Sequence, residues 1–252
     1  MFDVKNHTDG QVTAGMLIIG DEILSGRIRD SNAHHLAKML TLVGIDLKEI
    51  RAVADEQDAI VFAVNELRAK FTYVFTSGGI GPTHDDITAD AIGAAFGLPV
   101  DFHTDAMALL ETYYKERDVD FTAARKRMAR TPENADLIDN PISKAPGFVV
   151  GNVHVMAGVP AVFEAMLDNV IPTLKTGEKI VSGSVHCPFG EGVIGARLAA
   201  LQGEHDRTMI GSYPRYEDGA FWTEIVVRSR NPEAQLEAIS AVEQLVSSLK
   251  QH

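Results

Sequence analysis

The chain has 252 residues, of which 45% are hydrophobic and 23% charged, a composition typical of a folded protein with one large core or two unequal ones. Its formal net charge of −12 disfavours nucleic acid as a partner, because a polyphosphate backbone would be repelled. The single cysteine, Cys187, excludes an intramolecular disulfide, and no apolar run approaches the roughly 18 residues that span a bilayer, so we expect a cytoplasmic protein with no membrane partner.

The first part of the chain alternates short apolar runs with segments of helical period, after a polar tail at 1–13 that we expect to be disordered. Buried strands are predicted at 14–20, 45–54 and 73–76, and helices at 30–44 and 55–71. Asp30 or Ser31 is the expected N-cap of the first helix, and Asp55 that of the second. This β-α-β-α-β order predicts a mostly parallel sheet with helices on both faces.

The same pattern continues to residue 176, so we predict one three-layer α/β/α domain over 14–176. Further helices are predicted at 87–96, from Thr104 onward, at 122–130 and at 160–175. The basic run within 122–130 is interpreted as a solvated helix face, with contact to an anionic ligand as the alternative. The Pro-rich segment 131–147 is predicted to be loop, and 148–158 a hairpin that turns at Gly151-Asn152.

A second, smaller α+β domain is predicted at 177–252, because the order of elements changes there to β-α-β-β-α. Its strands are expected at 183–189, 208–215 and 220–229, and its helices at 191–202 and 232–250. The strand at 220–229 alternates strictly between apolar and polar residues, which is typical of a sheet with one buried face.

A glycine-rich turn directly precedes a cluster of carboxylates in TSGGIGPTHDDITAD at 76–90. Glycine amides before a helix N-terminus suit an anion, and this turn follows a strand at the carboxyl edge of the predicted sheet. A merely tight connection explains the turn alone equally well. Asp85, Asp86 and Asp90 are expected in the first turns of the helix, where they either stabilise its dipole or hold a divalent metal beside a phosphate.

A second loop at the same edge, GDEILSGRIRDSN at 20–32, also combines glycines with acids. Its candidate site residues are Gly20, Asp21, Glu22, Gly26 and Asn32. An acidic surface loop is the alternative interpretation. Asp55, besides its expected role as an N-cap, ends the second strand beside both loops, and the three segments together favour an anion-and-metal site.

Four segments, in chain order, resemble the molybdopterin-binding (MoCF-type) domain family: GDEILSGRIRDSN, TSGGIGPTHDDITADAI, NPISKAPGF and MAGVPAVFEAM. The resemblance covers about 14–176 and is most specific in GGIGPTHDDIT. It is greater to the branch of competence/damage-inducible protein A and of the molybdopterin-binding-like domain of FAD synthase, and the last domain, with GEGVIGARLAAL and IGSYPRY, resembles the next segment of the chain in that branch. The resemblance implies an α/β/α fold that binds a nucleotide or pterin phosphate, molybdopterin included, together with Mg²⁺, Mn²⁺ or Co²⁺.

The residues of the expected site fall into five groups, completed by this resemblance. The phosphate loop comprises Ser77, Gly78, Gly79, Gly81 and Thr83, and the metal ligands are Asp85 and Asp86. The first binding loop comprises Gly20, Asp21, Ser25, Gly26 and Asn32, and the closing loop Asn140, Lys144, Pro146 and Gly147. Asp86, Asp55 and Glu22 are the expected catalytic residues, and Lys144 or Arg27 is expected to neutralise developing charge.

The resemblance implies three alternative functions. The leading hypothesis is metal-dependent hydrolysis of a nucleotide diphosphate such as ADP-ribose or FAD. The alternatives are a molybdopterin adenylyltransferase and a non-catalytic nucleotide- or pterin-binding module. The chain departs from the family pattern at Ser143, Lys144 and Ala157, in loops that face the ligand in the family. A homo-oligomer is also expected, and no deamidase activity, because no deamidase domain follows.

Overall fold

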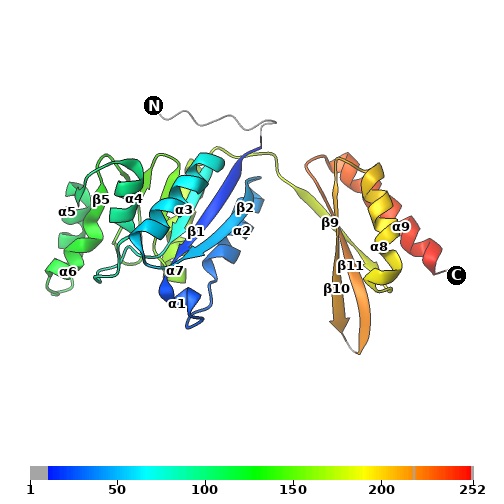
Figure 1. The fold of residues 1–252 in the computed structure, drawn as a ribbon, viewed down its shortest axis with the longest axis horizontal. Coiled ribbons are helices and arrows are strands. Elements are labelled where there is room, and N and C mark those ends of the chain that lie inside the picture. The colour runs from blue at the N-terminus through cyan, green and yellow to red at the C-terminus, as the bar shows by residue number, and fades with distance from the viewer. Residues whose placement is uncertain (1–10, 218, 251–252) are drawn as a thin grey trace. The chain divides into compact units, whose positions relative to one another are not determined.

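The computed structural model of the protein describes residues 11–217 and 219–250, so most of the predicted tail lies outside the described residues. The chain divides into two compact units, Met1–Gly177 and Glu178–His252. The first is an α/β unit and the second a smaller α+β unit, in agreement with the predicted fold classes (Figure 1). Within the described residues, no helix is both long and apolar enough to cross a membrane.

A six-stranded sheet forms the middle layer of the first unit, in the order β2-β1-β3-β8-β7-β6. Its strands are β1 (Thr13–Ile19), β2 (Asp46–Val53), β3 (Tyr73–Ser77), β6 (Asp136–Ile138), β7 (Gly147–Val150) and β8 (Val153–Met156). β2, β1, β3 and β8 are parallel, whereas β7 pairs antiparallel with β8 and β6. The carboxyl ends of the four parallel strands therefore meet at one edge, where folds of this class bind ligands.

Helices cover both faces of this sheet (Figure 1). α2 (Asn32–Leu42) and α7 (Pro160–Val170) pack on one face, and α3 (Gln57–Lys70) and α4 (Thr88–Phe96) on the other. Along β1, Met16 and Ile18 belong to the first core whereas Leu17 and Ile19 belong to the second, because successive strand side chains point to opposite faces. Two cores on one sheet confirm the predicted three-layer architecture.

The segment predicted as loop, 131–147, contains strand residues, so that prediction is wrong in part. β5 (Arg130–Pro132) pairs with β4 (Val100–Phe102), and β6 pairs with β7. Strands of three residues are too short to show an alternating pattern, which explains why the sequence missed them. Between β4 and β5 lie α5 (Thr104–Lys115), α6 (Ala123–Lys126) and the 3₁₀ turn η1 (Arg127–Ala129).

Two predicted roles at helix starts are also wrong. Asp55 is not the N-cap of α3: Glu56 holds that position, while Asp55 Oδ2 accepts a hydrogen bond from the Asp21 amide at 3.0 Å. α4 begins only at Thr88, so Asp85 and Asp86 precede the helix, and only Asp90 lies in its first turn. At α2, Ser31 is the N-cap as predicted, and the Asp30 carboxylate accepts from the Ala33 amide at 3.1 Å. A short helix, α1 (Asp21–Leu24), lies unpredicted within the loop 20–32.

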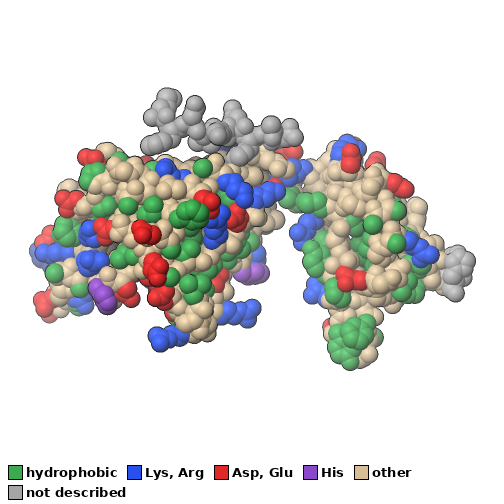
Figure 2. Space-filling model, in the orientation of Figure 1, with side chains coloured by type: hydrophobic (Ala, Val, Ile, Leu, Met, Phe, Trp, Pro, Cys, Tyr) green, Lys and Arg blue, Asp and Glu red, His purple; other side chains and the backbone are tan. Residues whose placement is uncertain are grey.

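The second unit has the predicted β-α-β-β-α order, in which two helices cover one face of an antiparallel sheet ordered β10-β11-β9. Its elements are β9 (Val181–Cys187), α8 (Glu191–Glu204), β10 (Met209–Glu217), β11 (Ala220–Ser229) and α9 (Pro232–Leu249). Ile225 and Val227 of β11 are fully buried in the core. Hydrophobic atoms also gather at the turn end of the β10–β11 hairpin, where the exposed rings of Tyr216 and Phe221 lie 4.6 Å apart (Figure 2).

A histidine is buried in the first core, on β8. The His154 ring stacks on Phe75 at 5.2 Å and meets the edge of Tyr73 at 5.7 Å, and its Nδ1 has no hydrogen-bond partner. Burial lowers the pKa of His154 from 6.5 to about 4, although the backbone carbonyls of Asn152 and Val74 favour the protonated form. The folded protein therefore keeps this imidazole neutral where the unfolded chain would protonate it.

This buried imidazole predicts that acid destabilises the protein through His154. Between pH 6.5 and about 4 the unfolded state binds a proton that the folded state does not, so stability falls as pH falls through this window. The loss attributable to His154 is about 3 kcal/mol once pH is below both pKa values. Urea unfolding at pH 7 and pH 4.5 should show a smaller pH dependence in His154→Phe than in the wild type. The exposed His84→Gln serves as the control, and an equal dependence in all three proteins would contradict the prediction.

Candidate functional site

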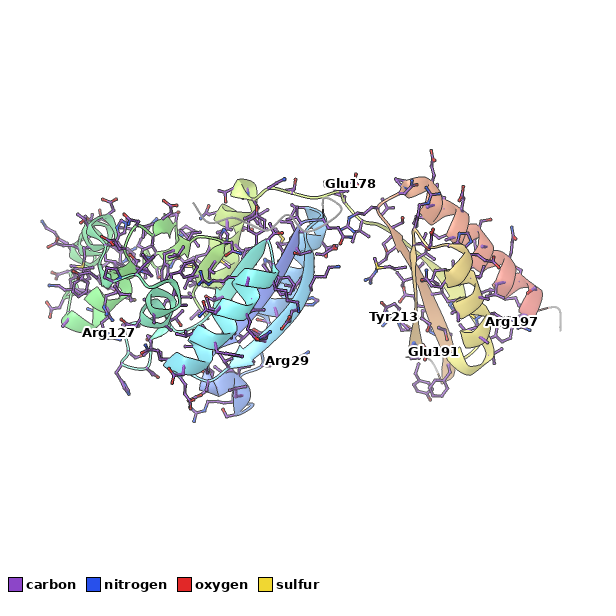
Figure 3. All side chains as sticks on the ribbon, turned by 45° about the horizontal axis from the view of Figure 1, so that its top comes forward. Arg29, Arg127, Glu178, Glu191, Arg197 and Tyr213 are labelled. Atoms are coloured by element: carbon purple, nitrogen blue, oxygen red, sulfur yellow. The ribbon has the colours of Figure 1, made fainter. Side chains whose placement is uncertain are left out.

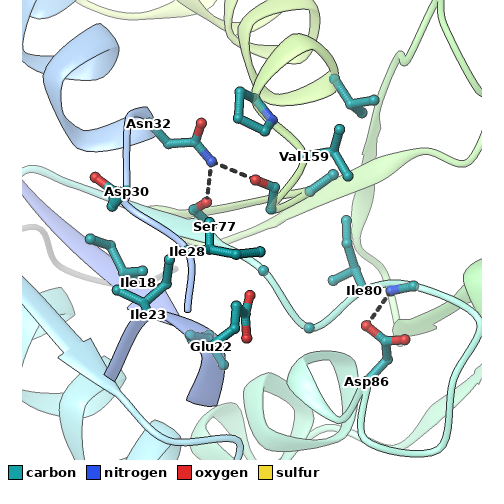
Figure 4. A pocket seen from close by; sticks show the side chains of 18 of the residues that line it. Ile18, Glu22, Ile23, Ile28, Asp30, Asn32, Ser77, Ile80, Asp86 and Val159 are labelled. Atoms are coloured by element: carbon teal, nitrogen blue, oxygen red, sulfur yellow. Dashed lines mark hydrogen bonds between the residues drawn. The ribbon is translucent and has the colours of Figure 1, made fainter. Parts of the chain in front are cut away.

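A pocket of about 490 Å³ opens at the carboxyl edge of β1, β3 and β8 (Figure 4). Its walls come from the loop 20–32, the glycine turn and its continuation at 77–86, the closing loop at 140–145 and the start of α7. These segments lie far apart in the sequence and meet because parallel strands end at one edge. The pocket thus lies where the two acidic glycine loops predicted a site.

The glycine turn after β3 has a backbone that only glycine adopts easily. Gly78 and Gly79 have φ of 112° and 68°, and a Cβ on Gly79 would lie 2.1 Å from Oγ1 of Thr88. The buried Thr88 pins the turn: its amide donates to the Gly79 carbonyl at 3.0 Å, and its hydroxyl to the Gly78 carbonyl at 3.1 Å. Among the described residues, the amides of Gly79 and Ile80 have no protein acceptor, so they remain available to an anion.

Asp86 closes the continuation of this turn. One carboxylate oxygen accepts from the Gly81 amide at 2.6 Å (Figure 4). The other accepts from the amide and the hydroxyl of Thr83 at 2.8 and 2.5 Å. Charge-assisted bonds of this kind are the strong ones in proteins. Asp86 therefore fixes the shape of this turn, and its predicted role as a metal ligand stays a prediction.

Four carboxylates gather beside the turn. The pKa of Asp55 is raised, first by partial burial and then by the negative charges of Asp21, Glu22 and Asp85, although the Asp21 amide opposes the shift. The Glu22 carboxylate folds back over Gly20, where a Cβ would lie 2.7 Å from its oxygens. This like-charge cluster is the kind of environment that a bound cation relieves.

The fit of these acids to a metal is partial. In the described part of the chain, no three His, Cys, Asp or Glu side chains are arranged to hold an ion by themselves. Mg²⁺ and similar ions, however, commonly take one or two protein carboxylates and complete their shell with substrate phosphates and water. The cluster around Asp55 suits an ion that arrives with a phosphate substrate.

Two buried asparagines join the segments that form the pocket. Asn32 donates from Nδ2 to Ser77 Oγ at 2.7 Å and to the Gly158 carbonyl at 2.8 Å, which ties α2 to the ends of β3 and β8. Asn140 donates to Ser143 Oγ and to the Ala145 carbonyl, at 2.6 and 2.8 Å, and thereby folds the closing loop. Both side chains fix pocket walls in place.

The structure divides the predicted site residues into two groups. Those lining the pocket are Glu22, Asn32, Ser77, Gly78, Gly79, Gly81, Asp86 and Asn140. Those outside its lining are Gly20, Asp21, Ser25, Gly26, Asp55, Thr83, Asp85, Lys144, Pro146 and Gly147. Gly147 has a packing reason instead, because a Cβ there would lie 2.3 Å from the Val155 carbonyl.

The apolar wall of the pocket and two residues that support the turn were not predicted from the sequence. Ile23, Ile28, Ile80, Met128 and Val159 line the wall. Thr88 and Arg127 hold the turn through its carbonyls. A threonine directly after DDI, at a helix start, was a visible signal for Thr88. No local pattern pointed to Arg127, since its partners lie 41 and 44 residues away.

Comparison with known proteins matches both units to described families. The family described as "Probable molybdopterin binding domain" matches residues 15–176, and "FAD synthase, middle domain" matches residues 179–252. A CinA-like protein of Geobacter sp. is 38% identical over 165 residues, which is 64% of this chain and 40% of that protein. The probable FAD synthase of Caenorhabditis briggsae is 29% identical over 252 residues, 90% of this chain and 48% of that one.

A solved structure supports the fold of the first unit. The CinA protein of Thermoplasma acidophilum, a protein of unknown function, is 31% identical and superposes with a TM-score of 0.60 over 66% of this chain and 99% of its own. The chain spans less than half of the Geobacter and Caenorhabditis relatives. Homo-oligomer formation and a cytoplasmic location stay predictions.

Proposed function

Because the chain belongs to the family of probable molybdopterin-binding domains, we propose that its first unit binds the diphosphate of a nucleotide and hydrolyses it with the help of a divalent metal. The observation that carries the proposal is the glycine turn, whose Gly79 and Ile80 amides have no acceptor among the described residues. The buried Thr88 and the half-buried Asp86 hold this turn in place. Such amides form a preorganised site for phosphate oxygens.

The carboxylates supply the rest of the chemistry. Asp85 and Asp55 would hold the metal beside the phosphate, and the metal would polarise the P–O bond. Glu22, which lines the pocket, orients a water molecule toward phosphorus and takes its proton as the new P–O bond forms. The bridging P–O bond breaks, and two phosphate products leave. The turn amides stabilise the negative charge that develops on the non-bridging oxygens.

The apolar wall supports a substrate with a flat ring beside its phosphates. Ile28 and Val159 lie at the pocket with 52% and 62% of their surfaces exposed. Burying such side chains against a nucleobase, flavin or pterin ring is favourable. The same shape suits a second candidate, adenylyl transfer to molybdopterin, because the family is described as probably binding molybdopterin. A third candidate is binding without catalysis. One observation supports it: both carboxylate oxygens of Asp86 already accept hydrogen bonds from amides of the loop.

An activity panel separates these candidates. The protein is incubated with ADP-ribose or FAD and Mg²⁺, Mn²⁺ or Co²⁺, and separately with MgATP and molybdopterin, and the products are resolved by chromatography. AMP formed from ADP-ribose or FAD supports hydrolysis. Adenylated molybdopterin instead supports transfer, and calorimetric binding without any product supports a binding module.

Asp55→Asn should separate function from stability. The variant keeps an oxygen acceptor for the Asp21 amide but removes one of four clustered charges. Because the folded state raises the pKa of Asp55, its charged form is disfavoured at pH 7, so the variant should gain stability, by about 1 kcal/mol or less after solvent screening. Hydrolysis should fall at least about tenfold. Retained hydrolysis would remove Asp55 from the proposed metal site, and Asp58→Asn, an exposed change on α3, is the matched control.

A further inference from the structure

We propose that Arg127 is a positioning residue that holds the anion-binding turn in shape, an inference that rests on the proposed function of this turn. Arg127 lies on η1, outside the segments that sequence patterns brought together (Figure 3). Its Nε donates to the Thr83 carbonyl at 3.2 Å, and its Nη2 to the Asp86 carbonyl at 3.1 Å. One guanidinium therefore bridges two carbonyls of a single turn.

These contacts complete the hydrogen bonding of the turn from its other side. The Asp86 carboxylate accepts hydrogen bonds from the amides of Gly81 and Thr83, whereas the Arg127 guanidinium donates to the carbonyls of Thr83 and Asp86. A planar guanidinium donates to two acceptors in fixed directions, whereas an ammonium presents a single point charge. Arg127 and Asp86 thus act on the same backbone with opposite charge and opposite hydrogen-bonding roles.

The segment that carries Arg127 is itself anchored on both sides. Arg130 donates to both carboxylate oxygens of Asp90 in α4, each at 2.7 Å, and Ala129 is fully buried. Met128 lines the pocket. α4 directly follows the turn. One short segment therefore contacts both elements: Arg127 bonds the turn, and Arg130 bonds α4. The position of Arg127 is therefore set by residues that do not belong to the turn.

Arg127 does not line the 490 Å³ pocket. It lines a much smaller cavity next to it, together with Gly79, Gly81 and Asp86. A group placed behind the turn acts on the substrate only through the turn. This location distinguishes a positioning role from direct contact with phosphate, for which a guanidinium would otherwise be well suited.

The test compares Arg127→Ala and Arg127→Lys with Arg125→Ala in the full chain. Arg125 lies two residues away, packs over the Tyr114 ring at 4.7 Å and contacts the Asp120 carbonyl, so it controls for loss of positive charge in this segment. Hydrogen exchange in peptides covering 78–87 should be about tenfold faster in Arg127→Ala than in the wild type. In Arg127→Lys the exchange rate should lie between those of the wild type and Arg127→Ala. KM for ADP-ribose should rise about tenfold with a smaller change in kcat, because the turn binds phosphate already in the ground state.

Two outcomes would overturn the proposal. One is exchange at 78–87 and a KM in Arg127→Ala that equal those of Arg125→Ala. The other is an equal loss of protection throughout the first unit in both Arg127 variants, which would reduce the residue to general stability. If the wild type does not turn over ADP-ribose, the proposed function fails separately, and the exchange data still decide the role of Arg127.

Discussion

Asp86→Ala is expected to lower hydrolysis of ADP-ribose by about a hundredfold while leaving the protein folded. The substitution removes the acceptor for the Gly81 and Thr83 amides and for the Thr83 hydroxyl. Hydrogen bonds to a charged group contribute about 1.5–3 kcal/mol each, and losing the shape of the turn costs about 3 kcal/mol of transition-state binding. The measurement is kcat/KM with a metal titration, alongside a thermal melt to confirm folding.

The metal titration distinguishes two roles for this carboxylate. If Asp86 shapes the turn, the variant loses rate at every metal concentration and the half-saturating concentration of metal stays unchanged. If Asp86 is a ligand, excess metal restores part of the rate. Asp58→Ala, which removes an exposed carboxylate from α3, is expected to behave as wild type. Wild-type activity in Asp86→Ala would contradict both roles and with them the proposed site.

The sequence could predict where the pocket lies because its location depends on strand order. AGMLIIG and YVFT read as buried strands, and both precede glycine loops, so parallel pairing brings the loops together at one edge. The turn was also predictable, because two adjacent glycines after a strand indicate a backbone with positive φ. Gly78 and Gly79 both have positive φ in the structure. Features of this kind need only local patterns and the rule that parallel strands share an edge.

The roles of single polar side chains could not be predicted in the same way. Asp55 has the local pattern of an N-cap, but the Asp21 amide, 34 residues away, takes its carboxylate instead. Arg127 reads as one more cation in a solvated basic run, yet two carbonyls across the fold hold it. A hydrogen bond between distant segments depends on tertiary geometry of a few tenths of an ångström, which no spacing in the sequence encodes.

The support behind the turn therefore matters as much as the residues that face the pocket. Thr88 and Asp86 satisfy the backbone of the turn from inside the chain segment, and Arg127 does so from outside it. Asp86 accepts hydrogen bonds from amides of the turn, whereas Thr88 and Arg127 donate hydrogen bonds to its carbonyls. Removing any one of these side chains therefore leaves backbone groups of the turn without partners. The turn is expected to respond to changes behind it even where nothing that touches the substrate has changed.

Gly79→Ala tests this coupling most directly and should abolish detectable binding of ADP-ribose. An added Cβ would lie 2.1 Å from Thr88 Oγ1, and the backbone has a φ of 68°, which costs a non-glycine residue about 1–2 kcal/mol. Gly97→Ala is the matched control, because Gly97 has a φ of 66° but open space around the Cβ position. The control should therefore show the backbone cost alone, with binding intact. Calorimetry with ADP-ribose and urea unfolding measure the two effects.

The double variant Gly79→Ala/Thr88→Ala identifies the clash as the cause. Thr88→Ala removes the oxygen that the new methyl group would meet, although its Cβ would remain 3.2 Å away. Gly79→Ala should then cost about 1 kcal/mol less stability in the Thr88→Ala background than in the wild type. Equal costs in both backgrounds would show that the two residues do not meet as described. Binding should stay lost in the double variant, because the Thr88 hydroxyl no longer holds the Gly78 carbonyl and the amides of Gly79 and Ile80 lose their fixed direction.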